Sequence, residues 1–201
     1  MYKRQQPNIL TANLTELPQV LTNCNQNIRF DCIMGRNILM SETDKQKIVR
    51  ELIPWLSDSG VMIFGETVPQ HTQRVYKLLE TTWLSTKLLS KLKQAEEAIY
   101  QDDTNPMVNW DSITLQRDLE TISQSVQIDL EHFNTSMLIT PKLIEHWFSL
   151  TNKTQKRISY RSHLEKILSA AEIDRIKTAF EKYLCHRTVS WSHTVAYITL
   201  K

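Results

Sequence analysis

The clearest pattern in the sequence is a pair of short apolar runs, at 28–40 and 61–68, with a helical spacing between them. Each run has the length and composition of a strand buried in a parallel sheet. Between them, Ser41 and Asp44 are spaced like a capping box, and 57–60 has the composition of a turn. The apolar positions of the intervening helix follow at Ile48, Val49, Leu52, Ile53 and Leu56. The pattern therefore predicts a right-handed βαβ unit.

Downstream, single apolar stripes predict helices, and alternation predicts strands. Residues 7–17 are expected to form a short strand and a polar loop. We expect one domain over 1–201, with a helical insert at 70–122 and helices at 141–186 between the last two strands. The predicted elements are a helix at 70–100, a loop at 101–109, a short helix to 122, a strand at 125–139, helices at 141–148, 160–168 and 170–186, and a strand at 190–201.

Composition is that of a soluble globular protein: 41% of the 201 residues are hydrophobic and 23% are charged. The net charge of +2 and the lack of a basic tail give no indication of direct nucleic-acid binding. No apolar run approaches the roughly 18 residues of a membrane span, and residues 1–6 are polar. We therefore expect a cytoplasmic protein whose three cysteines are reduced, packed thiols, since no CxxC spacing occurs.

Several kinds of chemistry lack their motifs. The only glycines are Gly35, Gly60 and Gly65, so no window holds the three glycines of a dinucleotide-binding loop, and the pair Gly60 and Gly65 lacks the lysine that follows the second glycine in a phosphate-binding loop. The six histidines show no metal-ligand spacing, and no GxSxG elbow is present. The lysines of 87–93 are interpreted as a solvated helix face rather than a binding patch.

Three segments resemble class I S-adenosylmethionine-dependent methyltransferases. FDCIMGRNILM at 30–40 resembles their fourth strand, commonly FDxIxxRNxL. ELIPWLSDSGVMIFGETVP at 51–69 resembles the next helix, turn and fifth strand. ANLTELP at 12–18 resembles the loop after the third strand, with Asn13 where that family usually has Asp. The resemblance implies an α/β fold with a partial Rossmann-like sheet, of strand order about 4-5-7-6 and with the last pair antiparallel.

A second resemblance is narrower. The segments ETVPQHTQRVYKLL, AEEAIYQDDTNPMVNWD and WSHTVAYITL are similar to the C-terminal extension of cyanobacterial AAA+ ATPases of the replication-associated recombination protein A type. This resemblance implies a partner, an AAA+ ATPase region in cis or in trans. The chain itself has neither a Walker A loop nor a Walker B strand, so we expect no ATPase activity from it.

The methyltransferase resemblance also implies a site. In that fold the cofactor lies across the carboxyl ends of the first and fourth strands. This chain begins at about the third strand and lacks the glycine loop. What would remain of the cofactor wall, as a vestigial site, is Asn13, Leu14, Gly35, Arg36 and Asn37.

Each candidate has a structural alternative. Gly35, Arg36 and Asn37 could form a cofactor rim or merely a strand-end turn. Asp31 could be a carboxylate near the methyl group or a hydrogen-bonded residue at the entry to the strand. Glu66 is expected at a strand end, where it faces a polar pocket or partner, with a satisfied structural carboxylate as the default.

Two functional hypotheses follow. In the first, the chain is a non-catalytic methyltransferase-like domain that acts in interaction or structure and binds no cofactor alone. In the second, it is an S-adenosylmethionine-dependent methyltransferase whose glycine-loop half is supplied upstream or by another chain. Without strands 1 and 2, the edge of strand 4 would be open to self-association, and residues 1–26 would be poorly anchored or folded back over it.

Overall fold

The computed structural model describes residues 9, 11–24, 27–150 and 158–201. The chain divides into two compact units. Unit 1 comprises 1–66, 112–129 and 196–201, and unit 2 comprises 67–111 and 130–195.

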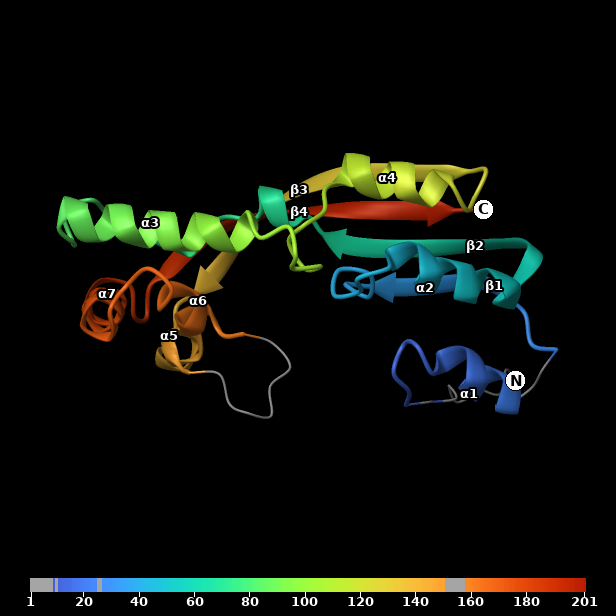
Figure 1. Cartoon of the computed structure of the whole chain (residues 1–201), viewed down its shortest axis with the longest axis horizontal. Helices are drawn as coiled ribbons and strands as arrows, with labels where there is room; N and C mark the ends of the chain where they lie inside the picture. Colours follow the sequence, from blue (N-terminus) through green and yellow to red (C-terminus); the bar gives the residue numbers. More distant parts are fainter. Residues whose placement is uncertain (1–8, 10, 25–26, 151–157) are drawn as a thin grey trace, which may run out of the picture. The chain divides into compact units, whose positions relative to one another are not determined.

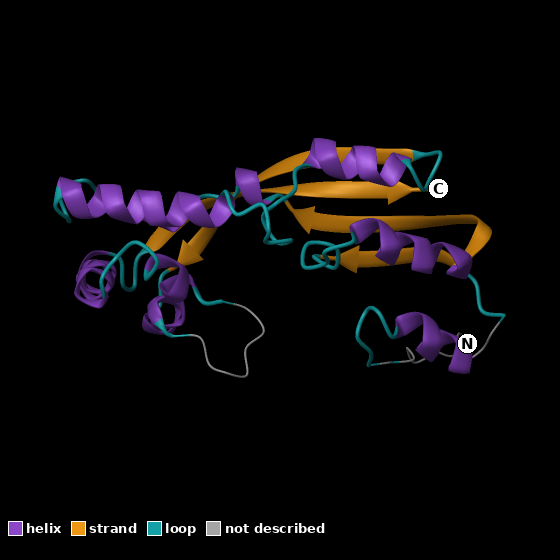
Figure 2. Cartoon of the chain, viewed as in Figure 1, coloured by secondary structure: helices purple, strands orange, loops and turns teal. Residues whose placement is uncertain are grey.

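The four strands of the sheet follow the order β1-β2-β4-β3 (Figures 1 and 2). Strands β1 and β2 are parallel, with Ile33 opposite Met62. Strands β3 and β4 are antiparallel, because Lys201 N donates to Ser125 O, and Ile139 N donates to Arg187 O. Their bounds are Phe30–Arg36 (β1), Leu56–Thr67 (β2), Val126–Leu138 (β3) and Thr188–Leu200 (β4). Order and directions confirm the predicted arrangement, 4-5-7-6 with an antiparallel last pair.

In unit 1, two helices lie on one side of the sheet: α2 in front of β1 and β2, and α4 in front of β4 and β3 (Figure 1). The predicted capping box is wrong, since α2 begins three residues later, after Asp44, whose Oδ1 accepts from Lys47 N at 2.8 Å. The helices of this unit are α1 (Leu17–Cys24), α2 (Lys45–Leu52), η1 (Ile53–Trp55) and α4 (Ser112–Glu120). Its core side chains include Leu39, Ile48, Val49, Leu52, Met62, Phe64, Leu115, Leu119, Ala196, Ile198 and Leu200.

The predicted turn at 57–60 is also wrong, because these residues belong to β2. They form an irregularity in the pairing: Phe30 lies opposite Leu56, whereas Cys32 lies opposite Val61. A Cβ on Gly60 would lie 2.8 Å from Phe30 O and 3.0 Å from Ser57 O, so this close backbone approach requires glycine.

Unit 2 is mainly helical. The prediction of one helix over 70–100 is correct only for its second half, where Ser85 caps α3 by accepting from Leu88 N. Two predicted helix starts are confirmed: Thr140 caps α5, which begins at Pro141, and Ser169 forms a capping box with Glu172 at the start of α7. Helix α3 packs on α6, and α5 packs on α6 and α7. The elements are η2 (Pro69–His71), η3 (Val75–Leu78), α3 (Thr86–Tyr100), α5 (Pro141–Phe148), α6 (Tyr160–Leu164) and α7 (Ala170–Tyr183).

The short strand predicted within 7–17 is not present in the described part of that segment. Residues 7, 8 and 10 of the expected short strand lie outside the described residues, as do 1–6, 25 and 26, and the described residues from 9 to 16 contain no strand. Instead a turn leads into α1, which the sequence did not indicate. Among the helices that the structure describes, none is both long and apolar enough to cross a bilayer.

Candidate functional site

The predicted rim at Gly35, Arg36 and Asn37 lies at the carboxyl end of β1, beside the end of β2. Asn37 has a positive φ of 53°, a conformation that asparagine tolerates better than most residues, and its N–H donates to Gly65 O at 2.9 Å. A Cβ on Gly35 would lie 2.7 Å from Ile38 Cδ1 and 3.1 Å from Phe64 Cδ1. The rim is therefore a tight turn packed against β2.

The turn is closed by a buried carboxylate. Glu66, with no exposed surface, accepts from Ile38 N at 2.9 Å and Leu39 N at 3.1 Å through Oε1, and from Met40 N at 3.1 Å through Oε2. The default expectation for Glu66, a satisfied structural carboxylate at a strand end, agrees with this geometry. Together with the bond from Asn37, four consecutive turn amides donate to residues of β2.

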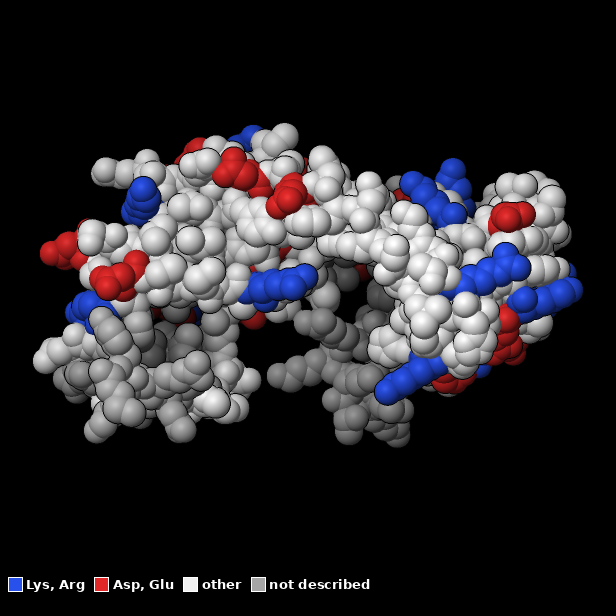
Figure 3. All heavy atoms as spheres, turned by 180° about the vertical axis from the view of Figure 1, so that it is seen from behind, with Lys and Arg blue, Asp and Glu red and all other residues white. Residues whose placement is uncertain are grey.

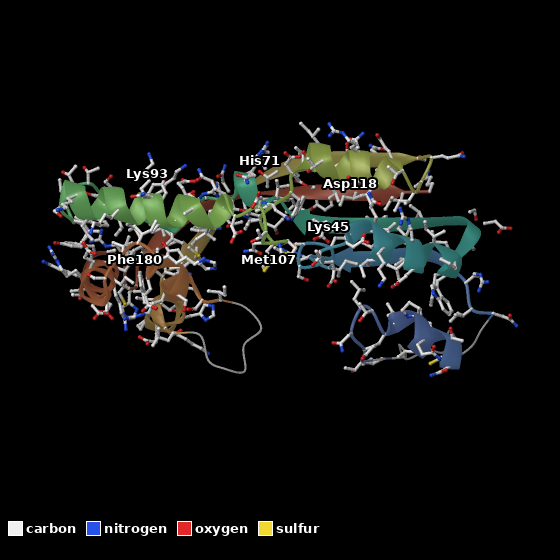
Figure 4. All side chains as sticks on the ribbon, in the orientation of Figure 1. Lys45, His71, Lys93, Met107, Asp118 and Phe180 are labelled. Carbon is white, nitrogen blue, oxygen red and sulfur yellow. The ribbon has the colours of Figure 1, made fainter. Side chains whose placement is uncertain are left out.

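Lys45, at the start of α2, adds a cation near this carboxylate. Burial lowers the pKa of Lys45, and the negative charges of Glu66, Glu42 and Asp118 oppose that shift. Burial raises the pKa of Glu66, against the three amides and Lys45. Figure 4 labels Lys45 and also Asp118, which lies on α4, so both helices contribute charge to this face of unit 1. Lys45 Nζ also donates to Glu42 O at 2.9 Å.

The other predicted wall residues are not joined to this turn by hydrogen bonds. Among the residues that the structure describes, Asn13 bonds only locally: its backbone oxygen accepts from Glu16 N and Leu17 N, and its side chain donates to Glu16 Oε2. For Leu14 the structure gives one such bond, from Leu17 N at 3.4 Å.

Asp31 lies at the opposite end of β1 from the turn. Its Oδ1 accepts from Ser57 Oγ at 2.8 Å, as expected for a hydrogen-bonded strand-entry residue. This position does not suit a carboxylate that acts beside a cofactor at the carboxyl ends of the strands.

The two faces of the β1–β2 pair differ in burial. On one face, Met62 and Phe64 of β2 are buried, with 1% and 0% exposed. On the other, Met34 of β1 is 74% exposed, Cys32 is exposed, and their partners across the pair, Ile63 and Val61, are half-buried. We call the surface of these last four residues the open face. Strand β1 is also the end strand of the sheet that the described residues form.

No metal centre accompanies this surface: across 9, 11–24, 27–150 and 158–201, no three His, Cys, Asp or Glu side chains form a metal-holding cluster. Sequence reasoning missed the link from Glu66 to the amides of 38–40 and the nearby Lys45. The available signal was one acidic residue, Glu66, directly after the apolar run at 61–65.

Comparison with known proteins gives limited information. No protein-family model matches the chain. No curated protein matches it. Among solved structures, a putative methyltransferase from Bacillus halodurans C-125 is similar at 10% identity with a TM-score of 0.39, over 85% of this chain and 63% of that one. The YcgJ protein from Bacillus subtilis matches at 12% identity with a TM-score of 0.36 over the same shares.

A third similar structure is the plantazolicin methyltransferase BamL, in complex with a triazolic desmethylPZN analog and SAH. It matches at 12% identity with a TM-score of 0.37, over 94% of this chain and 58% of that one. The chain thus spans 58–63% of the length of these proteins. Similarity at this level carries no information on activity or ligands, and the fold assignment depends on the strand order of the chain itself.

Proposed function

We propose that this chain is a non-catalytic, methyltransferase-like interaction domain that docks a second polypeptide on the open face and free edge of β1. The observation that carries the proposal is a conflict between sequence and burial. Residues 32–34 of β1 and 61–64 of β2 are apolar on both faces, the pattern of parallel strands covered on both sides, yet Met34 is 74% exposed. A partner that covers this surface would complete the layer that the sequence pattern anticipates.

The turn after β1 supports a non-catalytic role for the chain alone. All four amides of 37–40 already donate within the chain, so they are not available to a ligand. Of the proposed rim, the Arg36 side chain and the Asn37 surface remain exposed. These groups by themselves do not fit S-adenosylmethionine, and no step through that cofactor is assigned to them.

The partner that we propose is an AAA+ ATPase region linked to replication and recombination, in cis or in trans. Support comes from the resemblance of the segments at 66–79, 95–111 and 191–200 to an extension of such ATPases. This pairing would place the domain in the cytoplasm. A free strand edge also permits pairing with a second copy, which is the competing occupant.

The test compares Met34→Lys with Ile113→Lys. Ile113, on α4 of the same unit, is 68% exposed and serves as the matched control. We expect calorimetry to show that the ATPase region binds the wild-type chain and the Ile113→Lys variant equally, and the Met34→Lys variant at least about tenfold more weakly. Equal binding by both variants contradicts the proposal. Light scattering that shows a stable homodimer, broken only by Met34→Lys, would replace the ATPase with a second copy.

A second candidate is a methyltransferase completed by another segment of polypeptide. It is favoured by the strand order and by the place of Gly35, Arg36 and Asn37 at the carboxyl end of β1. Calorimetry with S-adenosylmethionine separates the candidates: we expect no saturable heat from this chain alone. Saturable binding that Arg36→Ala weakens would overturn the non-catalytic proposal.

A further inference from the structure

Unit 2 contains a pocket of about 300 Å³ between the start of α3 and one face of α7. On α7, the lining residues recur at intervals of three, four and seven positions, so they share one face of the helix. The pocket is lined by Trp83, Leu84, Ser85, Arg175, Thr178, Ala179, Lys182 and Tyr183.

The charge of this pocket is entirely positive. Arg175 and Lys182 are its only charged lining residues, and within the part of the chain that the structure describes neither is in an ion pair. Some other cations of unit 2 are in ion pairs, such as Lys91 with Glu172 at 2.7 Å and Arg161 with Asp174 at 3.2 Å, whereas Lys87 and Lys93 of α3 are in none of the ion pairs that the described residues form. Figure 3 shows Lys and Arg side chains gathered over unit 2, on the right of the view, with acidic side chains among them.

Aromatic contacts connect the two walls of the pocket. Trp83, just before α3, stacks on Tyr183 of α7 with ring centroids 4.7 Å apart and an interplanar angle of 11°. Lys182 Nζ lies 4.8 Å from the centroid of the Tyr183 ring. The aromatic stack and this cation–π contact order the pocket wall before any ligand arrives.

A neutral donor completes the set. The Ser85 side chain accepts from Leu88 N, which leaves its hydroxyl proton to donate. The first turn of α3 contains no acidic residue that would oppose an anion. Arginine, lysine and hydroxyl donors around one small pocket have the chemistry that recognises a phosphate group.

We propose that this pocket binds a small phosphate monoester with an aromatic or apolar body. Arg175 donates to two phosphate oxygens, Lys182 and Ser85 contact the phosphate, and the body lies against Trp83. The site is independent of the docking function proposed for unit 1, because none of its residues belongs to the open face.

The probe is phenyl phosphate, titrated against the whole chain by calorimetry and by tryptophan fluorescence. We expect saturable binding that weakens at least about tenfold in the Arg175→Ala/Lys182→Ala double variant. Lys93→Ala, an exposed cation on α3 outside the pocket, is the control and should bind as the wild type does. Trp83→Phe should abolish the fluorescence change while calorimetric binding persists.

Two results would overturn the proposal. The first is an absence of saturable heat with the wild-type chain. The second is equal weakening in the double variant and in Lys93→Ala, which would indicate only a general attraction of anions to the surface. A phosphotyrosine peptide forms a separate arm: if it binds and phenyl phosphate does not, the small-molecule assignment is wrong.

Discussion

Each unit buries one glutamate that accepts hydrogen bonds from consecutive backbone amides, but the two carboxylates differ in the elements that they connect. Glu66 in unit 1 binds three amides of a single turn, at 38–40. Glu96 in unit 2, on α3, accepts from Val75 N at 2.5 Å, Tyr76 N at 2.8 Å and the Tyr160 hydroxyl at 2.8 Å. Glu66 therefore closes a local turn, whereas Glu96 joins η3, α3 and α6.

The surroundings of the two carboxylates also differ. Arg74 beside Glu96 is itself 6% exposed, lies 3.4 Å from the centroid of the Tyr100 ring, and pairs with Glu97 at 3.3 Å. The Glu97 carboxylate also raises the pKa of Tyr76, to about 12, after the larger effect of burial. Glu66 has Lys45 as its nearby cation. The comparison shows that the same acceptor chemistry can join several elements of a unit or stabilise a single turn.

The largest expected effect is that of Glu96→Gln. Glutamine keeps one acceptor oxygen and adds an N–H₂ donor, so at least one buried donor loses its acceptor. We expect urea denaturation to show a loss of about 3 kcal/mol in the free energy of unfolding. Glu97→Gln, at a partly exposed site nearby, should cost about 1 kcal/mol and serves as the control. Equal costs for the two variants would contradict the anchoring role of Glu96.

A smaller and more local effect is expected for Glu66→Gln. Ile38 and Met40 are half-buried, so the loss of their acceptor leaves their amides closer to water than those bound by Glu96, and we expect a cost of about 1–2 kcal/mol. Amide exchange should accelerate chiefly at Ile38, Leu39 and Met40. The exposed Glu120→Gln on α4 should leave those rates unchanged. If exchange accelerated throughout unit 1 instead, the view of Glu66 as a local clamp would be wrong.

The smallest effect is a pH dependence that both carboxylates share. Burial raises the pKa of Glu66 and of Glu96 above the ordinary value of 4.5. Each raised pKa therefore adds to the free energy of unfolding below pH 4.5, and this contribution is lost as pH rises through the folded-state pKa of the carboxyl group. We expect the wild-type chain to gain stability relative to each Gln variant as pH falls from 8 toward 4.5. Thermal melts across this range check the sign; a gain toward high pH would contradict it.

The sheet could be predicted from the sequence because its strands follow local patterns of apolar residues and because their order follows from the resemblance to a known family. Apolar runs indicated β1 and β2, alternation indicated β3, and the methyltransferase resemblance gave the order of all four strands. Ser169 and Glu172 likewise predicted the start of α7 from adjacent positions. Such features need no knowledge of distant contacts.

The predictions failed where contacts between residues distant in sequence determine the local structure. Residues 70–85 belong to the predicted helix at 70–100, but the amides of Val75 and Tyr76 donate to Glu96, some twenty positions along the chain. Likewise, the residues around Glu66 in sequence do not indicate that its carboxylate oxygens accept hydrogen bonds from the backbone amides of 38–40. Of the candidate site, Gly35, Arg36 and Asn37 lie together at the end of β1, whereas the hydrogen bonds of Asn13 and Leu14 to described residues stay within their own segment.

The most direct test of the docking proposal is the amide exchange of β1 in the chain alone and with the ATPase region. An end strand with a free edge exchanges at its outward amides, and a docked strand or segment would protect them. We expect new protection confined to Cys32–Arg36 and its flanks, lost in Met34→Lys and retained in Ile113→Lys. Unchanged exchange across β1 in the complex, or protection elsewhere only, would contradict the proposal.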